Sequence, residues 1–150
     1  MPVMEERVFI ARPPQEVFDY ITDPEHIPVW DASVLKAEQV GSGPVGLGTR
    51  TRGTSKIMGR HFDWTTEQTL FEAPTRAVTK SVEGDLTFTV TNTVEPAEGG
   101  TRLTYRIDAD PGLGGVFGRL ADPFIEKVQS RTVRANLETL AELLGEHAKS

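Results

Sequence analysis

Residues 86–94 read Leu-Thr-Phe-Thr-Val-Thr-Asn-Thr-Val. Threonine occupies every second position, and the positions between are apolar except Asn92. Because successive side chains of a β-strand point to opposite faces, this alternation predicts a strand with one wet face and one enclosed face. The alternation of threonine, valine and aromatic residues continues over residues 34–109, interrupted by glycine- and proline-rich turns, and predicts a meander of about six strands.

Shorter patterned segments precede the meander. Residues 4–10 are β-branched and aromatic towards their end, which predicts a first strand that stops at the prolines 13 and 14. Residues 14–22 carry apolar side chains at helical spacing and predict a short helix that Asp23-Pro24 ends. A second short helical turn is expected at residues 25–30.

A long helix is predicted from the N-cap Asp122 to about Glu146. Its apolar stripe is formed by Val133, Leu137, Leu140, Ala141 and Leu144. Towards the start of the helix the same face becomes partly polar, at Gln129, Thr132 and Asn136.

The order of these segments predicts an α+β domain in which one curved antiparallel sheet of about seven strands folds around the last helix. A sheet curved over a helix touches it fully only at one end. Where the helix face turns polar and the inner face of the sheet carries large aromatics, we expect a hollow between them.

Composition excludes several classes of function. The chain has 150 residues, which predicts a single domain over residues 1–150. It has no cysteine, which excludes disulfide scaffolds, thiolate metal sites and cysteine nucleophiles and suits the cytoplasm. The formal charge of −6, with no cluster of lysine or arginine, disfavours nucleic acid as a partner. No signal peptide and no membrane span are predicted.

Motifs for bound metals and cofactors are weak. Residues 41–46, Gly-Ser-Gly-Pro-Val-Gly, match the G-x-G-x-x-G pattern, but the following residues favour a strand where a nucleotide site needs a helix. A hairpin connection is the better interpretation. The histidines His26, His61 and His147 are far apart and predict no metal site. We therefore expect no metal and no cofactor.

The sequence resembles the START-like (SRPBCC) polyketide cyclase/dehydrase and lipid transport family. The similarity lies in IARPPQEVFDYITDPE at 10–25, PVW at 28–30, GLGTR at 46–50, GR at 59–60, FEAPTR at 71–76, GGTRL at 99–103 and LETL at 137–140. It covers nearly the whole chain, in the family's order. The resemblance implies a helix-grip fold, with an internal cavity for a hydrophobic small molecule between the sheet and the C-terminal helix.

Strand parity identifies candidate residues for such a cavity. The expected inward-facing or rim side chains are aromatic or amide-bearing, with further amides on the helix. They are Trp30, which is expected near the rim, and Phe62, Trp64, Gln68, Phe88, Asn92, Tyr105, Gln129 and Asn136. Ordinary core packing is the competing interpretation for each aromatic, and a solvated flank for the helix amides. The orientation of Arg50 and Arg52 stays open, with parity favouring the outer face.

Three functions are compatible with these observations. The first is binding of a hydrophobic or aromatic small molecule, polyketide- or lipid-like, and it is the preferred one. The second is a polyketide aromatase/cyclase, which performs aldol condensation and dehydration in the same cavity, with catalytic residues that the sequence does not identify. The third is a protein-interaction module, which predicts a collapsed core and an exposed apolar patch.

Overall fold

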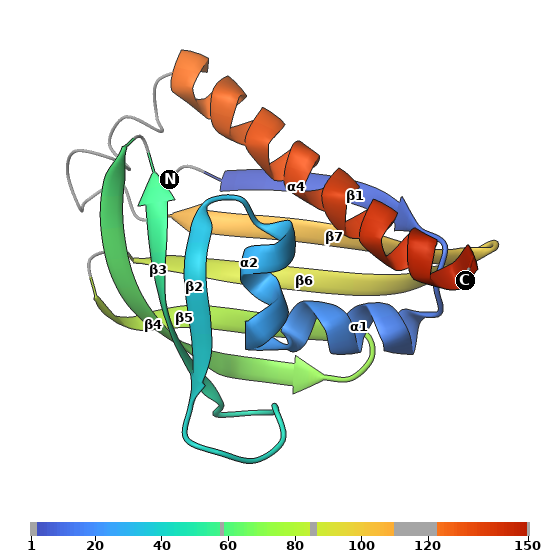
Figure 1. Ribbon diagram of the computed structural model, residues 1–150, viewed down its shortest axis with the longest axis horizontal. Helices are drawn as coiled ribbons and strands as arrows, with labels where there is room; N and C mark the ends of the chain where they lie inside the picture. Colours follow the sequence, from blue (N-terminus) through green and yellow to red (C-terminus); the bar gives the residue numbers. More distant parts are fainter. Residues whose placement is uncertain (1–2, 58, 85–86, 110–122, 150) are drawn as a thin grey trace.

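The computed structural model describes residues 3–57, 59–84, 87–109 and 123–149, with side chains described for 3–56, 59–84, 87–108 and 131–145. Within these residues, seven strands form one antiparallel sheet in the order β1-β7-β6-β5-β4-β3-β2 (Figure 1). The strands are β1 (Val3–Ile10), β2 (Val34–Val40), β3 (Arg50–Ile57), β4 (Arg60–Glu72), β5 (Arg76–Gly84), β6 (Phe88–Ala97) and β7 (Gly100–Ala109). The segment 41–46 lies in the connection between β2 and β3, as expected for a hairpin.

All described helices lie on one side of the sheet. Three short ones follow β1: α1 (Pro14–Thr22), the 3-10 helix η1 (Pro24–His26) and α2 (Ile27–Trp30). The C-terminal helix α4 (Pro123–Lys149) crosses the sheet over β1 and β7 (Figure 1). The predicted α+β helix-grip architecture is confirmed. The helix ends three residues beyond the predicted Glu146, and the predicted N-cap Asp122 lies outside the described residues.

The sheet curves because its longest strand is bulged. The pairing of β4 with β5 shifts register between Thr65 and Thr66 and again between Gln68 and Leu70. Each bulge adds a residue to one strand and increases the local twist. The curved sheet leaves a concave face towards the helices, as the bend of β4 in Figure 1 shows.

The core fills one end of this concave face. The apolar stripe of α4 contributes Leu137, Leu140 and Leu144 to a buried cluster that includes Phe18 of α1 and Leu103 of β7. The predicted helix stripe therefore faces the sheet at its apolar end.

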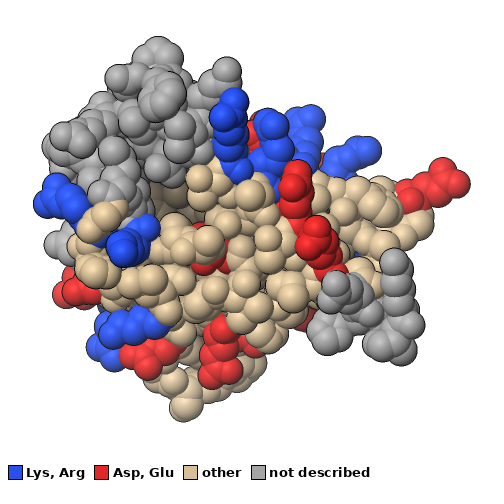
Figure 2. All heavy atoms as spheres, turned by 45° about the horizontal axis from the view of Figure 1, so that its top comes forward, with Lys and Arg blue, Asp and Glu red and all other residues tan. Residues whose placement is uncertain are grey.

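Several charged side chains on the outer surface form ion pairs. Arg50 binds Glu67 at 3.1 Å and Arg52 binds Glu38 at 2.9 Å, so both arginines lie on the outer face of the sheet. Figure 2 shows basic and acidic side chains in several separate groups on one face of the molecule. No helix within the described residues is long and apolar enough to cross a membrane.

Candidate functional site

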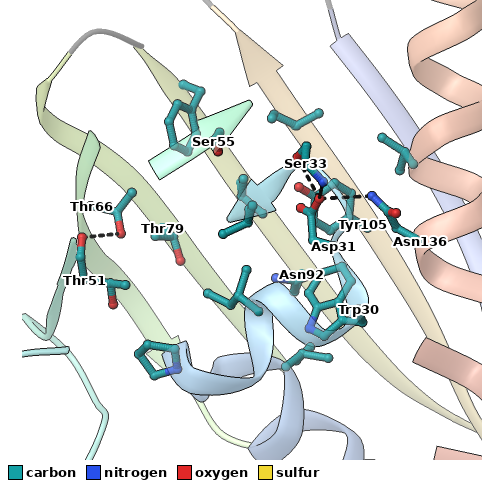
Figure 3. Close-up of a pocket in the computed structure, with 18 of the residues that line it drawn as sticks. Trp30, Asp31, Ser33, Thr51, Ser55, Thr66, Thr79, Asn92, Tyr105 and Asn136 are labelled. Atoms are coloured by element: carbon teal, nitrogen blue, oxygen red, sulfur yellow. Dashed lines mark hydrogen bonds between the residues drawn. The ribbon is translucent and has the colours of Figure 1, made fainter. Parts of the chain in front are cut away.

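A pocket of about 180 Å³ opens between the concave face of the sheet, the α1–α2 segment and the middle of α4 (Figure 3). Most of its wall is apolar or aromatic. The largest such side chains are those of Trp30, Trp64, Phe88 and Tyr105. The pocket lies where the apolar stripe of α4 gives way to polar residues, at Thr132 and Asn136.

Most of the residues expected at a cavity line this pocket. They are Trp30, Trp64, Gln68, Phe88, Asn92, Tyr105 and Asn136. Asn92 and Tyr105 lie next to each other because β6 pairs with β7 so that these two residues are directly opposite. Along β4, Phe62 and Trp64 are buried while Asp63 between them is exposed, as period-two alternation predicts.

Two expected residues are not placed in the wall. Phe62 is buried on the concave face, but it is not among the described residues that line the pocket. The guanidinium of Arg60 instead lies 5.5 Å from the centre of its ring. Gln129 lies in the part of α4 whose side chains are outside the described residues.

Trp30 is more deeply buried than the expected position at the rim. Its side chain is 5% exposed, and its ring meets that of Tyr105 edge to face, with centroids 6.2 Å apart. The short helix α2 places it there, because Trp30 is the last residue of that helix before the chain enters β2.

Trp64 is fixed against the opposite strand. Its indole N–H donates a hydrogen bond to the Ser55 hydroxyl at 2.8 Å, and its ring meets Phe88 edge to face. Gly53 lies directly opposite Trp64 in the pairing of β3 with β4. A Cβ atom on Gly53 would lie 2.5 Å from the indole ring, so only glycine leaves room for this side chain.

Asp31, in the turn between α2 and β2, is a pocket residue that the sequence interpretation did not include. Its Oδ1 accepts hydrogen bonds from the Ser33 backbone N–H at 3.0 Å, the Ser33 hydroxyl at 2.7 Å and Asn136 Nδ2 at 3.1 Å (Figure 3). Among the described residues, Oδ2 has no hydrogen-bond partner. This second oxygen is available to a molecule in the pocket.

Asn136 holds the Asp31 turn instead of presenting a free amide to the pocket. Its Nδ2 donates to Asp31, and its Oδ1 accepts from the Ala32 backbone N–H at 3.2 Å. Both ends of the amide are therefore used within the protein. The expectation that Asn136 lines the pocket is met, but its hydrogen bonds tie α4 to the turn before β2.

Burial raises the pKa of Asp31 and of Tyr105, the two ionisable residues in the described lining of the pocket. It raises the pKa of the Asp31 carboxyl, and the hydrogen bonds from Ser33 oppose this rise. Burial also raises the pKa of the Tyr105 hydroxyl far above its usual value, and the negative charge of Asp31 raises it further. Tyr105 therefore remains a protonated hydrogen-bond donor throughout the physiological pH range.

Two buried polar atoms in the pocket wall lack partners among the described residues. They are the indole N–H of Trp30 and the amide oxygen of Asn92. Leaving such an atom unpaired costs about 1–3 kcal/mol, so each one in a folded protein calls for an explanation.

Metal ligation finds no support in the described part of the chain. Within it, no group of three or more histidine, cysteine, aspartate or glutamate side chains comes together. The described lining of the pocket contains Asp31 and no lysine, arginine or histidine. The carboxylate is thus not balanced by a basic side chain in the wall.

A protein-family model matches nearly the whole chain. The model of the family described as polyketide cyclase / dehydrase and lipid transport matches residues 1–145. A search among curated protein sequences finds no significant match.

Solved structures share the fold over their full length or over one domain. The TTHA0849 protein of Thermus thermophilus has a TM-score of 0.78 and 25% identity, covering 99% of this chain and 100% of that one. A START superfamily protein from Mycobacterium smegmatis has a TM-score of 0.72 and 14% identity, covering 96% and 97%. The di-domain ARO/CYC StfQ of the steffimycin biosynthetic pathway has a TM-score of 0.74 and 18% identity, and the match covers 99% of this chain and 52% of StfQ.

Proposed function

The chain belongs to the polyketide cyclase / dehydrase and lipid transport family, and from this membership we propose that it binds a hydrophobic or aromatic small molecule in the pocket between the sheet and α4. The observation that carries the proposal is an apolar pocket whose wall contains a few polar groups with spare hydrogen-bonding capacity. Ligand sites commonly combine an apolar lining with a small number of orienting polar atoms.

The spare polar groups distinguish this pocket from a packing defect. Asp31 Oδ2 and the Tyr105 hydroxyl have no hydrogen-bond partner among the described residues, and both residues line the pocket. A void left by imperfect packing is expected to be apolar, because empty cavities carry no polar groups that need water or ligand. Aromatic side chains supply the ligand's burial in this proposal, and these polar groups orient it.

The volume of the pocket limits the ligand. A cavity of about 150 Å³ is large enough to hold benzene, and this pocket has about 180 Å³. We propose a ligand that places one or two rings, or an apolar portion of similar size, against Trp64 and Phe88. A longer polyketide or lipid would extend beyond the present walls.

Native mass spectrometry of the protein from cell extract tests the proposal directly, because a co-purifying small molecule appears as a defined mass increase. In parallel, the uncharged two-ring dye prodan tests the pocket in vitro. We expect binding with a Kd of roughly 1 μM, equivalent to about 8 kcal/mol, accompanied by a blue shift of the dye emission.

A pair of matched variants locates the dye. Val90 lines the pocket, whereas Val82 is 43% exposed on β5. Val90→Phe should fill part of the pocket and weaken prodan binding at least tenfold, while Val82→Phe should leave it unchanged. Absence of dye binding by the parent protein, together with no co-purifying molecule, would refute the ligand-binding function.

An aromatase/cyclase activity is a second candidate, favoured by the presence of a carboxylate beside a phenol in the pocket. In this candidate mechanism, Asp31 Oδ2 accepts a proton from a carbon next to a carbonyl, and Tyr105 donates a hydrogen bond to the enolate oxygen that forms; both residues line the pocket. The intramolecular aldol step needs no other reactant, since the carbanion attacks a second carbonyl and the adduct then loses water. Incubation with a short poly-β-ketone and detection of the dehydrated ring tests this candidate.

The pocket argues against the interaction-module alternative, which predicts a collapsed core.

A further inference from the structure

The charge of Asp31 is not needed for the hydrogen bonds that hold this residue. All three are donated to Oδ1, from Ser33 and Asn136. An asparagine in the same position would accept them with its amide oxygen. Burying a carboxylate in an apolar wall is costly unless the charge is paired, and no basic side chain is present among the described lining residues. The second oxygen therefore has hydrogen-bonding capacity that the described part of the fold does not use.

Tyr105 supplies the complementary group. Its hydroxyl has no hydrogen-bond partner among the described residues, and the charge of Asp31 is close enough to raise its pKa. In Figure 3 the Tyr105 and Asp31 side chains occupy the same part of the pocket, next to Asn136. The wall thus offers a strong acceptor and a donor within one neighbourhood.

A ligand hydroxyl satisfies both groups at once, because it donates one hydrogen bond and accepts another. A ketone would accept from Tyr105 and leave Asp31 unpaired. A ligand carboxylate would be repelled by ionised Asp31. An ammonium group could donate to Asp31 and to the Tyr105 oxygen, but it would leave the Tyr105 O–H proton without an acceptor. Hydrogen bonds to an ionised carboxylate are roughly twice as strong as neutral ones. A phenolic or enolic hydroxyl is more acidic than an aliphatic one and is therefore the stronger donor in such a bond.

We propose that the ligand of this pocket carries a phenolic or enolic hydroxyl, which donates a hydrogen bond to Asp31 Oδ2 and accepts one from the Tyr105 hydroxyl. This inference rests on the ligand-binding function proposed above and names the chemical class of its ligand. It assigns Asp31 and Tyr105 as the residues that determine specificity.

The test uses four probes that share one ring system: 2-naphthol, 2-methoxynaphthalene, naphthalene and 2-naphthylmethylammonium. Their Kd values for the full-length parent protein are measured by calorimetry at pH 7. We expect 2-naphthol to bind at least tenfold more tightly than each of the other three. Binding of all four with similar affinity, or tightest binding of the ammonium probe, would overturn the inference while leaving the ligand-binding function intact. Failure of all four to bind would instead count against that function.

Variants identify the atoms responsible. Asp31→Asn and Tyr105→Phe should each reduce the preference for 2-naphthol over 2-methoxynaphthalene to less than threefold, with little change for naphthalene. The controls are Asp19→Asn on the exposed side of α1 and Tyr20→Phe, whose ring stacks on His26 outside the pocket wall. They make the same chemical changes and should keep the preference.

Urea unfolding verifies that each variant is folded, and Tyr105→Phe alone decides the outcome if Asp31→Asn fails to fold. An unchanged preference in a folded Asp31→Asn or Tyr105→Phe variant would refute the assigned contact.

Discussion

Asp31 is a carboxylate in the pocket wall that is held through one of its oxygens by hydrogen bonds from Ser33 and Asn136. Strand parity predicted the inward position of Trp64, Gln68 and Asn92, because side chains in a strand alternate with a period of two. Asp31 lies in a turn, where the alternation of side chains found in strands does not apply. From the sequence it is indistinguishable from an ordinary turn aspartate that accepts hydrogen bonds from the residue two positions later. In the fold its carboxylate also accepts a hydrogen bond from Asn136, which is 105 residues away along the chain.

Removing the charge of Asp31 should alter how stability depends on pH. Because burial raises its pKa in the folded state, the folded protein holds this proton more tightly than the unfolded chain does. Its stabilising contribution is complete below the unfolded pKa of about 3.9 and is lost as pH rises through the raised folded value. Asp31→Asn lacks this loss, so its stability relative to the parent should increase between pH 4 and pH 7.

Urea unfolding at several pH values measures this difference, with Asp19→Asn as the exposed control. We expect Asp31→Asn to be at least as stable as the parent at pH 7, which is typical of a residue kept for function at a cost in stability. A relative stability that falls from pH 4 to pH 7 would contradict the raised pKa.

Strands and helices could be predicted where apolar and polar residues repeat regularly over a long stretch of sequence. The alternation in 86–94 and the stripe from Val133 to Leu144 identified β6 and the C-terminal part of α4. The bulges in β4 were not visible in the sequence, because an extra residue in one strand depends on its partner strand. These bulges curve the sheet over the pocket, so its size could not be predicted from parity.

The contact between β3 and β4 is sensitive to a single methyl group. In Gly53→Ala, the added Cβ would lie 2.5 Å from the Trp64 ring and 2.7 Å from the Lys36 carbonyl oxygen. One of these groups must move, so we expect a loss of about 1–3 kcal/mol in the free energy of unfolding and a change in prodan affinity as Trp64 shifts. Urea unfolding and dye titration measure both.

Gly46→Ala is the control for this substitution, because no atom lies within 4 Å of a Cβ at Gly46. Its stability should lie within about 0.5 kcal/mol of the parent. A Gly53→Ala variant as stable as Gly46→Ala would show that the contact relaxes without cost.

At the scale of the whole molecule, the pocket lies where the inward face of α4 changes from apolar residues, which pack in the core, to polar residues. Leu137, Leu140 and Leu144 close the core at one end, while Thr132 and Asn136 face the open part of the concave surface. The order of elements and this change from apolar to polar could be read from the sequence. The bond from Asn136 to the turn before β2 could not, because it joins segments whose distance is set only by folding.

Ligand binding in this pocket should stabilise the entire fold, because its wall is built from the sheet, α1, α2 and α4 together. A ligand that binds only the folded state at 100 times its Kd adds about 2.7 kcal/mol. For a chain of 150 residues this corresponds to a rise in Tm of roughly 5–10 °C. Scanning calorimetry with prodan at 100 times the parent Kd should show this rise in the parent and in Val82→Phe, and a rise of at most about half that size in Val90→Phe. An equal rise in Val90→Phe would mean that the dye binds elsewhere on the protein, and the walls described above would then not be the ligand site.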